Sequence, residues 1–487
     1  MKEWTREERY RVLQDAEEIR DLHERIQRSA YRQAWHVQPV TGLSSDPNGF
    51  AWHDGKWHLF YQWCPWGAVH GLKYWYHVTS GDLIRWTNEG IGMKPDTIYD
   101  NRGVHSGSAI SADGELYLYY TGNHRDENWI RTPYTCAAKL GKDGKPAKLP
   151  EPLFGPLSGY TEHQRDPKIL YHKERQKYYI FLGAQSEDQN GCVLVYESEQ
   201  LLSGWSFAGR LKVPGYEQFG GMWECPCIGT IGGKDILLFS PQYIRLPGRA
   251  ENTNHNIYLI GNMDYDTLTF TPESVYRHLD YGFDFYAAQL AADTRDPDSA
   301  VLIAWMGLPD HHYPTEDEDW EGSLTVPRKL RICEGRLVQE PVSGIEALRI
   351  RELAPGGILP DACELEVEAD GKNEDLDLRL FTDGNGTGGL RLSYHAEQKL
   401  CTADRTGLNR RFNPETGEIL SIPLDRPLKQ LRIFIDRSSV EIFFNQGEAV
   451  FTSHVYPEKE ERHYTVSRPV PTKLWELGSS VTDDFVI

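Results

Sequence analysis

From Trp35 onward the chain alternates short apolar runs with turns rich in Gly, Asp and Asn. This pattern is typical of short β-strands joined by tight turns. Residues 5–28 differ, because their apolar side chains recur every three or four positions and predict one amphipathic helix that Thr5 and Glu8 could cap. The apolar face of that helix comprises Tyr10, Leu13, Ala16, Ile19, Leu22 and Ile26. The sequence therefore predicts an all-β protein with a short N-terminal helix.

A turn followed by an aromatic-rich strand recurs five times, at a period of roughly 60 residues. The five copies are DGKWHLFYQ at 54, DGELYLYYT at 113, ERQKYYIFL at 174, GGKDILLFS at 232 and DSAVLIAWM at 298. Each period has room for two further strands, so we expect four-stranded blades around a central channel. The repeat predicts a five-bladed β-propeller.

The chain of 487 residues is too long for one ordinary domain. Residues 360–456 continue the alternation of short strands beyond the fifth repeat, as a β-sandwich would. We therefore expect an N-terminal helical segment (1–33), a five-bladed propeller domain (34–345) and a C-terminal β-sandwich domain (346–487). The protein could be a monomer or a homodimer.

The net charge of −20 and the pI near 5.3 argue against nucleic acid or an anionic membrane as partner, because both would repel this surface. Met1 is followed by charged residues, without an apolar stretch long enough for a signal peptide or a membrane span. We expect a cytoplasmic protein.

Neither the eight cysteines nor the 17 histidines show the spacing of a metal site or a disulfide scaffold. We expect reduced, structural cysteines, no metal and no cofactor.

Three carboxylates precede the repeated turns at one sequence distance, eight residues: Asp46 before Asp54, Asp166 before Glu174, and Glu224 before Gly232. Since the inner strands of a propeller converge on its channel, we expect these acids to hold equivalent positions and to meet at one mouth. His105 and Ser106, before Asp113, should lie near the same ring. Each acid could instead cap a turn, as Asp does in DPNG.

Several carboxylates in a pocket with aromatic residues favour glycoside hydrolysis. The hydroxyl and amide groups of SSDPNG suit Asp46 as an ionised nucleophile. Glu224 lies between Trp223 and Cys225, an apolar setting that suits a general acid and base. Arg165 should keep Asp166 ionised, so Asp166 would stabilise the transition state by accepting hydrogen bonds from sugar hydroxyls.

Over nearly its whole length the chain resembles glycoside hydrolase family 32. The resemblance rests on HVQPVTGLSSDPNGF at 36, WHLFYQ at 57, HGLKYWYHVTSGDLIRW at 70, HSGSA at 105, RDPK at 165, WECP at 223, YAAQ at 286 and IDRSSVEIFFNQGEAVFTSHVYP at 435. It implies a retaining β-fructofuranosidase that acts on sucrose or sucrose 6-phosphate through a fructosyl-enzyme. It places the nucleophile, the stabiliser and the acid/base on Asp46, Asp166 and Glu224. It also implies sugar-binding roles, each of which could instead be structural, for Asn48, Gln62, Trp75, Ser106, Arg165, Tyr286 and Trp305.

One departure from the family pattern concerns the residue before the proposed nucleophile. The family usually has Asn there, preceded by an apolar residue, whereas this chain has Ser45 preceded by Ser44. A fructosyltransferase or a fructo-oligosaccharide hydrolase therefore stays open. So do a non-catalytic sugar-binding propeller and an arabinan-cleaving one, although the retained carboxylates and the C-terminal motif speak against them.

Recognition of a phosphate group would need local positive charge in this acidic protein. Lys73 and His70 in HGLKYW could supply it, with Arg131 and Arg245 as further candidates. Each could equally be a solvated surface charge.

Overall fold

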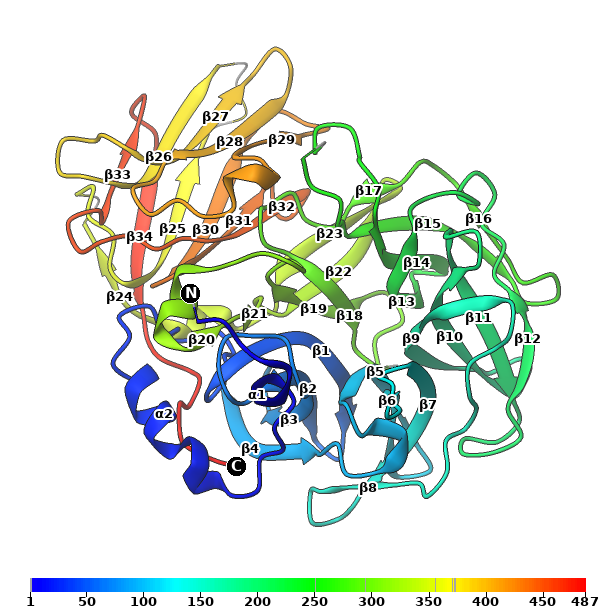
Figure 1. Cartoon of the computed structure of the whole chain (residues 1–487). Coiled ribbons are helices and arrows are strands. Elements are labelled where there is room, and N and C mark those ends of the chain that lie inside the picture. Colours follow the sequence, from blue (N-terminus) through cyan, green and yellow to red (C-terminus); the bar gives the residue numbers. More distant parts are fainter. Residues whose placement is uncertain (1, 250, 294, 355, 370, 372–373) are drawn as a thin grey trace.

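The computed structural model of the chain describes residues 2–249, 251–293, 295–354, 356–369, 371 and 374–487. It has a short helical segment at the N-terminus, a ring of β-sheets and a separate β-sandwich formed by the C-terminal part of the chain (Figure 1). The predicted all-β fold class with a short N-terminal helix is therefore confirmed.

Five sheets form the blades of the propeller, and each begins with a strand that enters one of the repeated turns. The first two blades comprise β1 (Gly42–His53), β2 (Lys56–Cys64), β3 (Tyr74–Ser80) and β4 (Trp86–Met93), then β5 (Val104–Ala112), β6 (Glu115–Arg125), β7 (Arg131–Leu140) and β8 (Pro146–Lys148). The third comprises β9 (Tyr160–His172), β10 (Lys177–Ser186), β11 (Gly191–Ser198) and β12 (Ser206–Arg210). The last two comprise β13 (Met222–Ile231), β14 (Lys234–Gln242), β15 (Ile257–Asp264), β16 (Thr269–Pro272) and β17 (Arg277–His278), then β18 (Tyr286–Leu290), β19 (Ala300–Met306), β21 (Ser323–Leu324), β22 (Arg328–Cys333) and β23 (Arg336–Pro341).

The first strands of successive blades contact one another around the ring. β1 contacts β5, β5 contacts β9, β9 contacts β13, β13 contacts β18, and β18 contacts β1. The short strand β20 (Trp320–Glu321), between two strands of the last blade, pairs in parallel with β1 and joins the last blade to the first. The strand that enters each repeated turn is therefore innermost, as the repeat predicts.

The sandwich consists of a six-stranded and a five-stranded antiparallel sheet. The larger has the order β24 (Arg349–Leu353), β34 (Thr472–Leu477), β25 (Ala362–Glu368), β30 (Gln430–Asp436), β31 (Ser439–Phe444) and β32 (Ala449–His454). The smaller has the order β29 (Ile419–Pro423), β28 (Leu400–Gly407), β27 (Gly389–His395), β26 (Leu376–Thr382) and β33 (His463–Val466). Alternate residues such as Leu378, Leu380, Ile433 and Ile435 are buried in one core between them.

The predicted continuous helix over residues 5–28 is wrong. The segment instead forms α1 (Arg6–Arg9), a 3-10 turn (Ala16–Ile19) and α2 (Arg20–Ile26). Thr5 and Glu8 do form the predicted capping box. Asp15 forms a second one, because its carboxylate accepts from the Glu17 amide at 3.0 Å while Glu18 accepts from the Asp15 amide at 3.0 Å. This second helix start separates α2 from α1.

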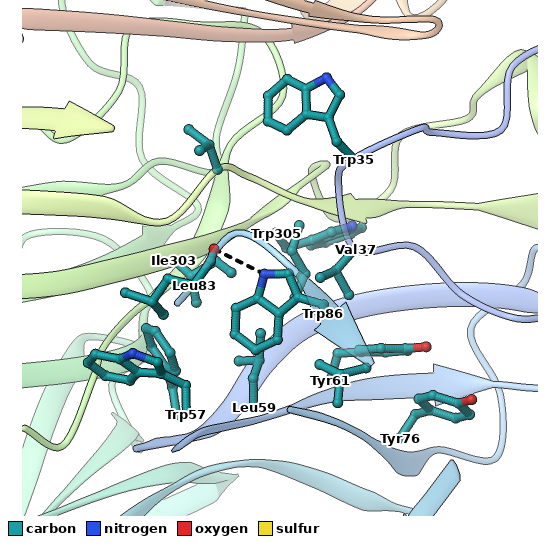
Figure 2. Close-up of a cluster of buried hydrophobic side chains, with 14 of the residues drawn as sticks. Trp35, Val37, Trp57, Leu59, Tyr61, Tyr76, Leu83, Trp86, Ile303 and Trp305 are labelled. Atoms are coloured by element: carbon teal, nitrogen blue, oxygen red, sulfur yellow. Dashed lines mark hydrogen bonds between the residues drawn. The ribbon is translucent and has the colours of Figure 1, made fainter. Parts of the chain in front are cut away.

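The largest hydrophobic cluster joins the first blade, the last blade and the N-terminal segment (Figure 2). Trp35 precedes the first blade, Trp57 and Tyr61 belong to β2, and Trp305 belongs to β19. Trp86 donates from its indole to the Leu83 carbonyl at 3.2 Å. Burial of these large rings therefore holds the two ends of the propeller ring together.

A buried ionic network joins the propeller to the sandwich. The two ring nitrogens of His36 lie 3.0 Å from Asp436 and 3.0 Å from Glu441. Arg328 of β22 donates to Glu441 at 2.7 Å and to Asp280 at 2.9 Å. Burial alone would lower the pKa of His36, but the hydrogen bonds and charges of Asp436 and Glu441 raise it to about 9. His36 is therefore a buried cation at neutral pH.

Within the described residues, no helix is long and apolar enough to cross a membrane. All eight cysteines lie among those residues and are free.

Candidate active site

Asp46 lies on β1, at the inner edge of the first blade. Its Oδ2 accepts a hydrogen bond from the Ser106 hydroxyl of β5 at 2.5 Å and one from the Gln62 amide of β2 at 3.3 Å. Its Oδ1 has no hydrogen-bond partner among the described residues. Two neutral donors thus hold one oxygen in place and leave the other open to a ligand.

Three residues with implied sugar-binding roles form the support of Asp46. Asn48 donates to the Asp46 carbonyl at 2.7 Å and accepts from the Gly107 amide at 2.8 Å. Gln62 donates to Ser106 as well as to Asp46, and its Oε1 accepts from Lys73. These contacts tie the first two blades together around the carboxylate.

Glu224 of β13 receives donors from both neighbouring blades. Arg165 of β9 contacts its Oε1 with Nε at 2.8 Å and with Nη2 at 2.7 Å. The Tyr286 hydroxyl of β18 donates to its Oε2 at 2.7 Å. The Glu224 side chain is 16% exposed, so it is reachable while its position is fixed. The expected apolar setting of Glu224 is wrong, because polar groups meet both oxygens.

Asp166 of β9 is buried, and the charges of Glu224 and Asp46 both act on it. Its Oδ2 accepts from the Cys225 amide at 2.9 Å, and its own amide donates to Thr121 at 2.9 Å. Burial, followed by the charge of Glu224, raises the pKa of Asp166 to about 7. The charge of Arg165 lowers this pKa, but its effect is smaller. The expectation that Arg165 keeps Asp166 firmly ionised is wrong, because the guanidinium hydrogen bonds go to Glu224.

Strand pairing corrects the assumed equivalence of the three acids. Arg165 opposes Gly183, Glu224 opposes Ser240 and Tyr286 opposes Trp305, and a β-bulge follows each pair. Arg165, Glu224 and Tyr286 are therefore the equivalent residues of three consecutive blades. Asp166, Cys225 and Ala287 come next, with φ of 65°, 47° and 52°. Counting eight residues back from each repeated turn aligns Asp166 with Glu224, whereas strand pairing aligns Arg165 with Glu224. The count is wrong by one residue because the turn after β9 is longer than the turn after β13.

The two tryptophans with implied sugar contacts are buried. Trp75 is 0% and Trp305 is 1% exposed, and both belong to hydrophobic clusters. Trp75 donates to the His105 carbonyl at 3.1 Å, and Trp305 packs in the core shown in Figure 2. The structure gives these rings a packing role, and it does not present them for stacking on a sugar.

Sequence reasoning missed two supporting residues, Thr121 and Cys225. Thr121 lies on β6 and holds the Asp166 backbone, and Cys225 contributes its amide. The amide donation depends on a left-handed bulge at a cysteine, for which the sequence contains no signal.

A cavity of about 570 Å³ adjoins the site. It is lined by His163, Gln185 and Tyr243, and the His163 ring contacts Arg165 at 2.8 Å.

Comparison with family models identifies the family of the chain. The family 32 N-terminal domain of the glycosyl hydrolases matches residues 36–341, and the family 32 C-terminal domain matches residues 345–470. The chain belongs to glycoside hydrolase family 32 and is a hydrolase of the β-fructofuranosidase type.

Its relatives can be described more closely. It is 38% identical to a sucrose-6-phosphate hydrolase of Staphylococcus xylosus over 473 residues, 94% of either chain. The structure of a sucrose-6-phosphate hydrolase from Lactobacillus gasseri matches with a TM-score of 0.91 and 34% identity, covering 98% of this chain and 100% of the other. A β-fructofuranosidase from Bombyx mori matches with a TM-score of 0.82 and 28% identity, covering 96% and 100%, and a variant of it has been solved with sucrose.

Proposed function

We propose that the protein is a retaining β-fructofuranosidase that removes the terminal fructosyl unit of sucrose 6-phosphate or sucrose. The observation that carries this proposal is the arrangement of Asp46 and Glu224 around Asp166. One carboxylate has a free oxygen, and the other has both oxygens held by donors from neighbouring blades. Two carboxylates with such different surroundings suit the two roles of a retaining glycosidase.

In the first step, Asp46 Oδ1 attacks the anomeric carbon of the fructosyl unit. The bond between that carbon and the glycosidic oxygen breaks, and Glu224 gives the oxygen its proton. A guanidinium has no acceptor for a proton, whereas a tyrosine hydroxyl can accept as well as donate. In the acid form of Glu224 we therefore place the proton on Oε2, away from Arg165; the Tyr286 hydroxyl, which donates to Oε2 of the ionised carboxylate, then accepts instead.

In the second step, Glu224 takes a proton from water, and the resulting hydroxide oxygen bonds to the anomeric carbon. The bond to Asp46 breaks, so fructose leaves and both carboxyl groups return to their first states. Asp166 is the proposed stabiliser. The Cys225 amide holds its Oδ2, so its Oδ1 is the oxygen that would accept from sugar hydroxyls.

The proposal of a phosphorylated substrate is supported by the relatives in Staphylococcus xylosus and Lactobacillus gasseri. A cytoplasmic location is part of the proposal, because phosphate esters of sugars do not cross membranes unaided and free cysteines suit a reducing compartment.

Kinetics on the purified protein test this function. We expect hydrolysis of at least one of the two sugars, and an early product of retained configuration by NMR. Asp46→Asn should lose activity by about three orders of magnitude or more, because the covalent step is removed. Activity on arabinan with none on either sugar would show the proposal to be wrong.

Transfer of fructose to a sugar acceptor is a second candidate, and Ser45 carries it. The Ser45 hydroxyl is buried and lies 3.4 Å from Gln62 Oε1, in place of the family's longer Asn. Chromatography of the products from concentrated sucrose tests this candidate. Trisaccharides in wild type that disappear in Ser45→Asn would support it, and glucose and fructose alone would exclude it.

A further inference from the structure

Four cations lie together beside the candidate active site without a carboxylate partner. They are Lys73, Arg102, Arg125 and Arg131, and we call them the cationic rim. In the described part of the chain, no Asp or Glu comes within ion-pair distance of any of the four. This is unexpected in a protein with a net charge of −20, where carboxylates outnumber cations by 72 to 52. The arrangement leaves a concentrated positive charge for a ligand.

The rim is built into the first two blades. Lys73 precedes β3, Arg102 precedes β5, Arg125 ends β6 and Arg131 begins β7. Asn123 anchors two of them, since it accepts from Arg131 Nε at 2.8 Å and donates to the Arg102 carbonyl at 2.9 Å. The arrangement is therefore held by the fold.

The rim has donors to spare. The Nε atoms of Arg102 and Arg125 are buried and have no hydrogen-bond partner among the described residues. Both guanidinium groups pack on the ring of Trp129, at 5.3 and 5.2 Å from its centroid, which restricts their movement. The terminal nitrogens of Arg131 make no hydrogen bond within the described chain. The two Nε atoms are themselves closed to a ligand, so the donors left for an anionic ligand are the terminal nitrogens, above all those of Arg131.

The rim adjoins the catalytic carboxylates on two sides. Lys73 donates to Gln62, which donates to Asp46. Burial and then the like charge of Arg165, whose guanidinium contacts Glu224, lower the pKa of Arg131 to about 10. The same cations act on His105. Burial has the largest effect in lowering the pKa of His105, and the charges of Lys73, Arg131 and Arg165 lower it further. A group bound at the rim would thus be within reach of a sugar held at Asp46.

We propose that the cationic rim binds the phosphate group of a phosphorylated disaccharide and makes the enzyme prefer sucrose 6-phosphate to sucrose. This inference rests on the proposed function. The rim suits a phosphate dianion, because planar guanidinium groups match its oxygens in pairs while a lysine adds a compact charge. Free inorganic phosphate offers the same chemistry and would compete for the same groups.

The ratio of kcat/KM for sucrose 6-phosphate to kcat/KM for sucrose tests the proposal. In wild type this ratio should be well above one and should fall as salt is added, because salt screens the rim. Arg131→Gln and Arg125→Gln should each lower it about ten- to a hundredfold, since each removes hydrogen bonds to a charged group. Arg131→Lys should keep part of the ratio, because the charge stays and the planar fork is lost. Arg351→Gln, an exposed arginine of the sandwich, is the matched control and should leave the ratio unchanged.

Equal losses on both sugars, or a wild-type ratio near one, would overturn the inference while leaving the fructofuranosidase intact. If wild type hydrolyses neither sugar, the proposed function fails, and calorimetric titration with inorganic phosphate still tests the rim. Binding that Arg131→Gln abolishes and Arg351→Gln retains would support an anion site, and no binding to wild type would overturn it.

Discussion

Arg165 and Glu224 are equivalent residues of neighbouring blades, and their side chains are joined at 2.8 Å between Nε and Oε1. The next blade supplies Tyr286 at the same position, and its hydroxyl contacts Glu224 from the other side at 2.7 Å. A cation, an acid and a hydroxyl thus occupy one repeated position around the channel. The propeller repeat itself fixes the proposed acid between its two partners.

The role of Glu224 predicts a dependence on the leaving group. Glu224→Gln should lower kcat/KM for sucrose by about two to four orders of magnitude, the usual contribution of a general acid. A p-nitrophenyl fructoside needs little protonation of its leaving group, so the first step should lose much less. Burst kinetics on both substrates measure this difference. Equal losses would assign Glu224 a different role.

Tyr286→Phe removes one contact of Glu224 and keeps the ring. Since Tyr286 is 2% exposed and otherwise packs in the core, the fold should tolerate the change. We expect kcat to fall about ten- to a hundredfold with little change in KM, because the hydroxyl orients the acid and is not placed on the substrate. Steady-state kinetics with sucrose check this. A rise in KM at constant kcat would instead place the hydroxyl on the sugar.

The raised pKa of Asp166 predicts that ionisation of this carboxyl group lowers the free energy of unfolding. Its folded pKa of about 7 lies above the ordinary 3.8, so the folded protein binds the extra proton between these values. The free energy of unfolding therefore falls as pH rises from 4 to 7, and the cost is fully present above pH 7. Asp166→Asn should be more stable relative to wild type at pH 8 than at pH 5, by roughly 1–3 kcal/mol. Urea unfolding at both pH values measures this, with the exposed Asp298→Asn as a control that should show no such trend.

The raised pKa of His36 predicts a second pH dependence of stability, at the interface between propeller and sandwich. Its folded pKa of about 9 lies above the ordinary 6.5, so its stabilising contribution is complete below pH 6.5 and is lost as pH rises through 9. The stability difference between wild type and His36→Gln should shrink over this range by up to about 3 kcal/mol. Urea unfolding at pH 6.5 and 9.5 tests this. The exposed His395→Gln should show a constant difference, and a constant difference for His36→Gln as well would contradict the charged network.

The sequence predicts the blade number, the innermost strands and the three carboxylates, because period and alternation are direct consequences of strand geometry. It could not predict the bulges at Asp166, Cys225 and Ala287, since none of these residues requires a positive φ. It also assigned Arg165 to its sequence neighbour Asp166, whereas the fold turns this side chain toward the next blade. Adjacency along a strand is a poor guide to contact, because successive side chains point to opposite faces.

The contact between the two domains predicts the effect of one added methyl group. Residues 281–284 follow the fourth blade and lie along the edge strand β32, where the Tyr281 amide donates to Val450 at 2.8 Å and the Asp284 amide to Thr452 at 3.2 Å. A Cβ on Gly282 would lie 1.8 Å from the Thr452 carbonyl oxygen, so the strand and the segment would have to move apart. Gly282→Ala should therefore lower the free energy of unfolding by about 1–3 kcal/mol or more, as overpacking does, and should speed proteolysis between the domains. Gly81→Ala is the control, because no atom lies within 4 Å of its added Cβ. If thermal unfolding and limited proteolysis gave the same result for both variants, residues 281–284 would not hold the sandwich against the propeller in solution.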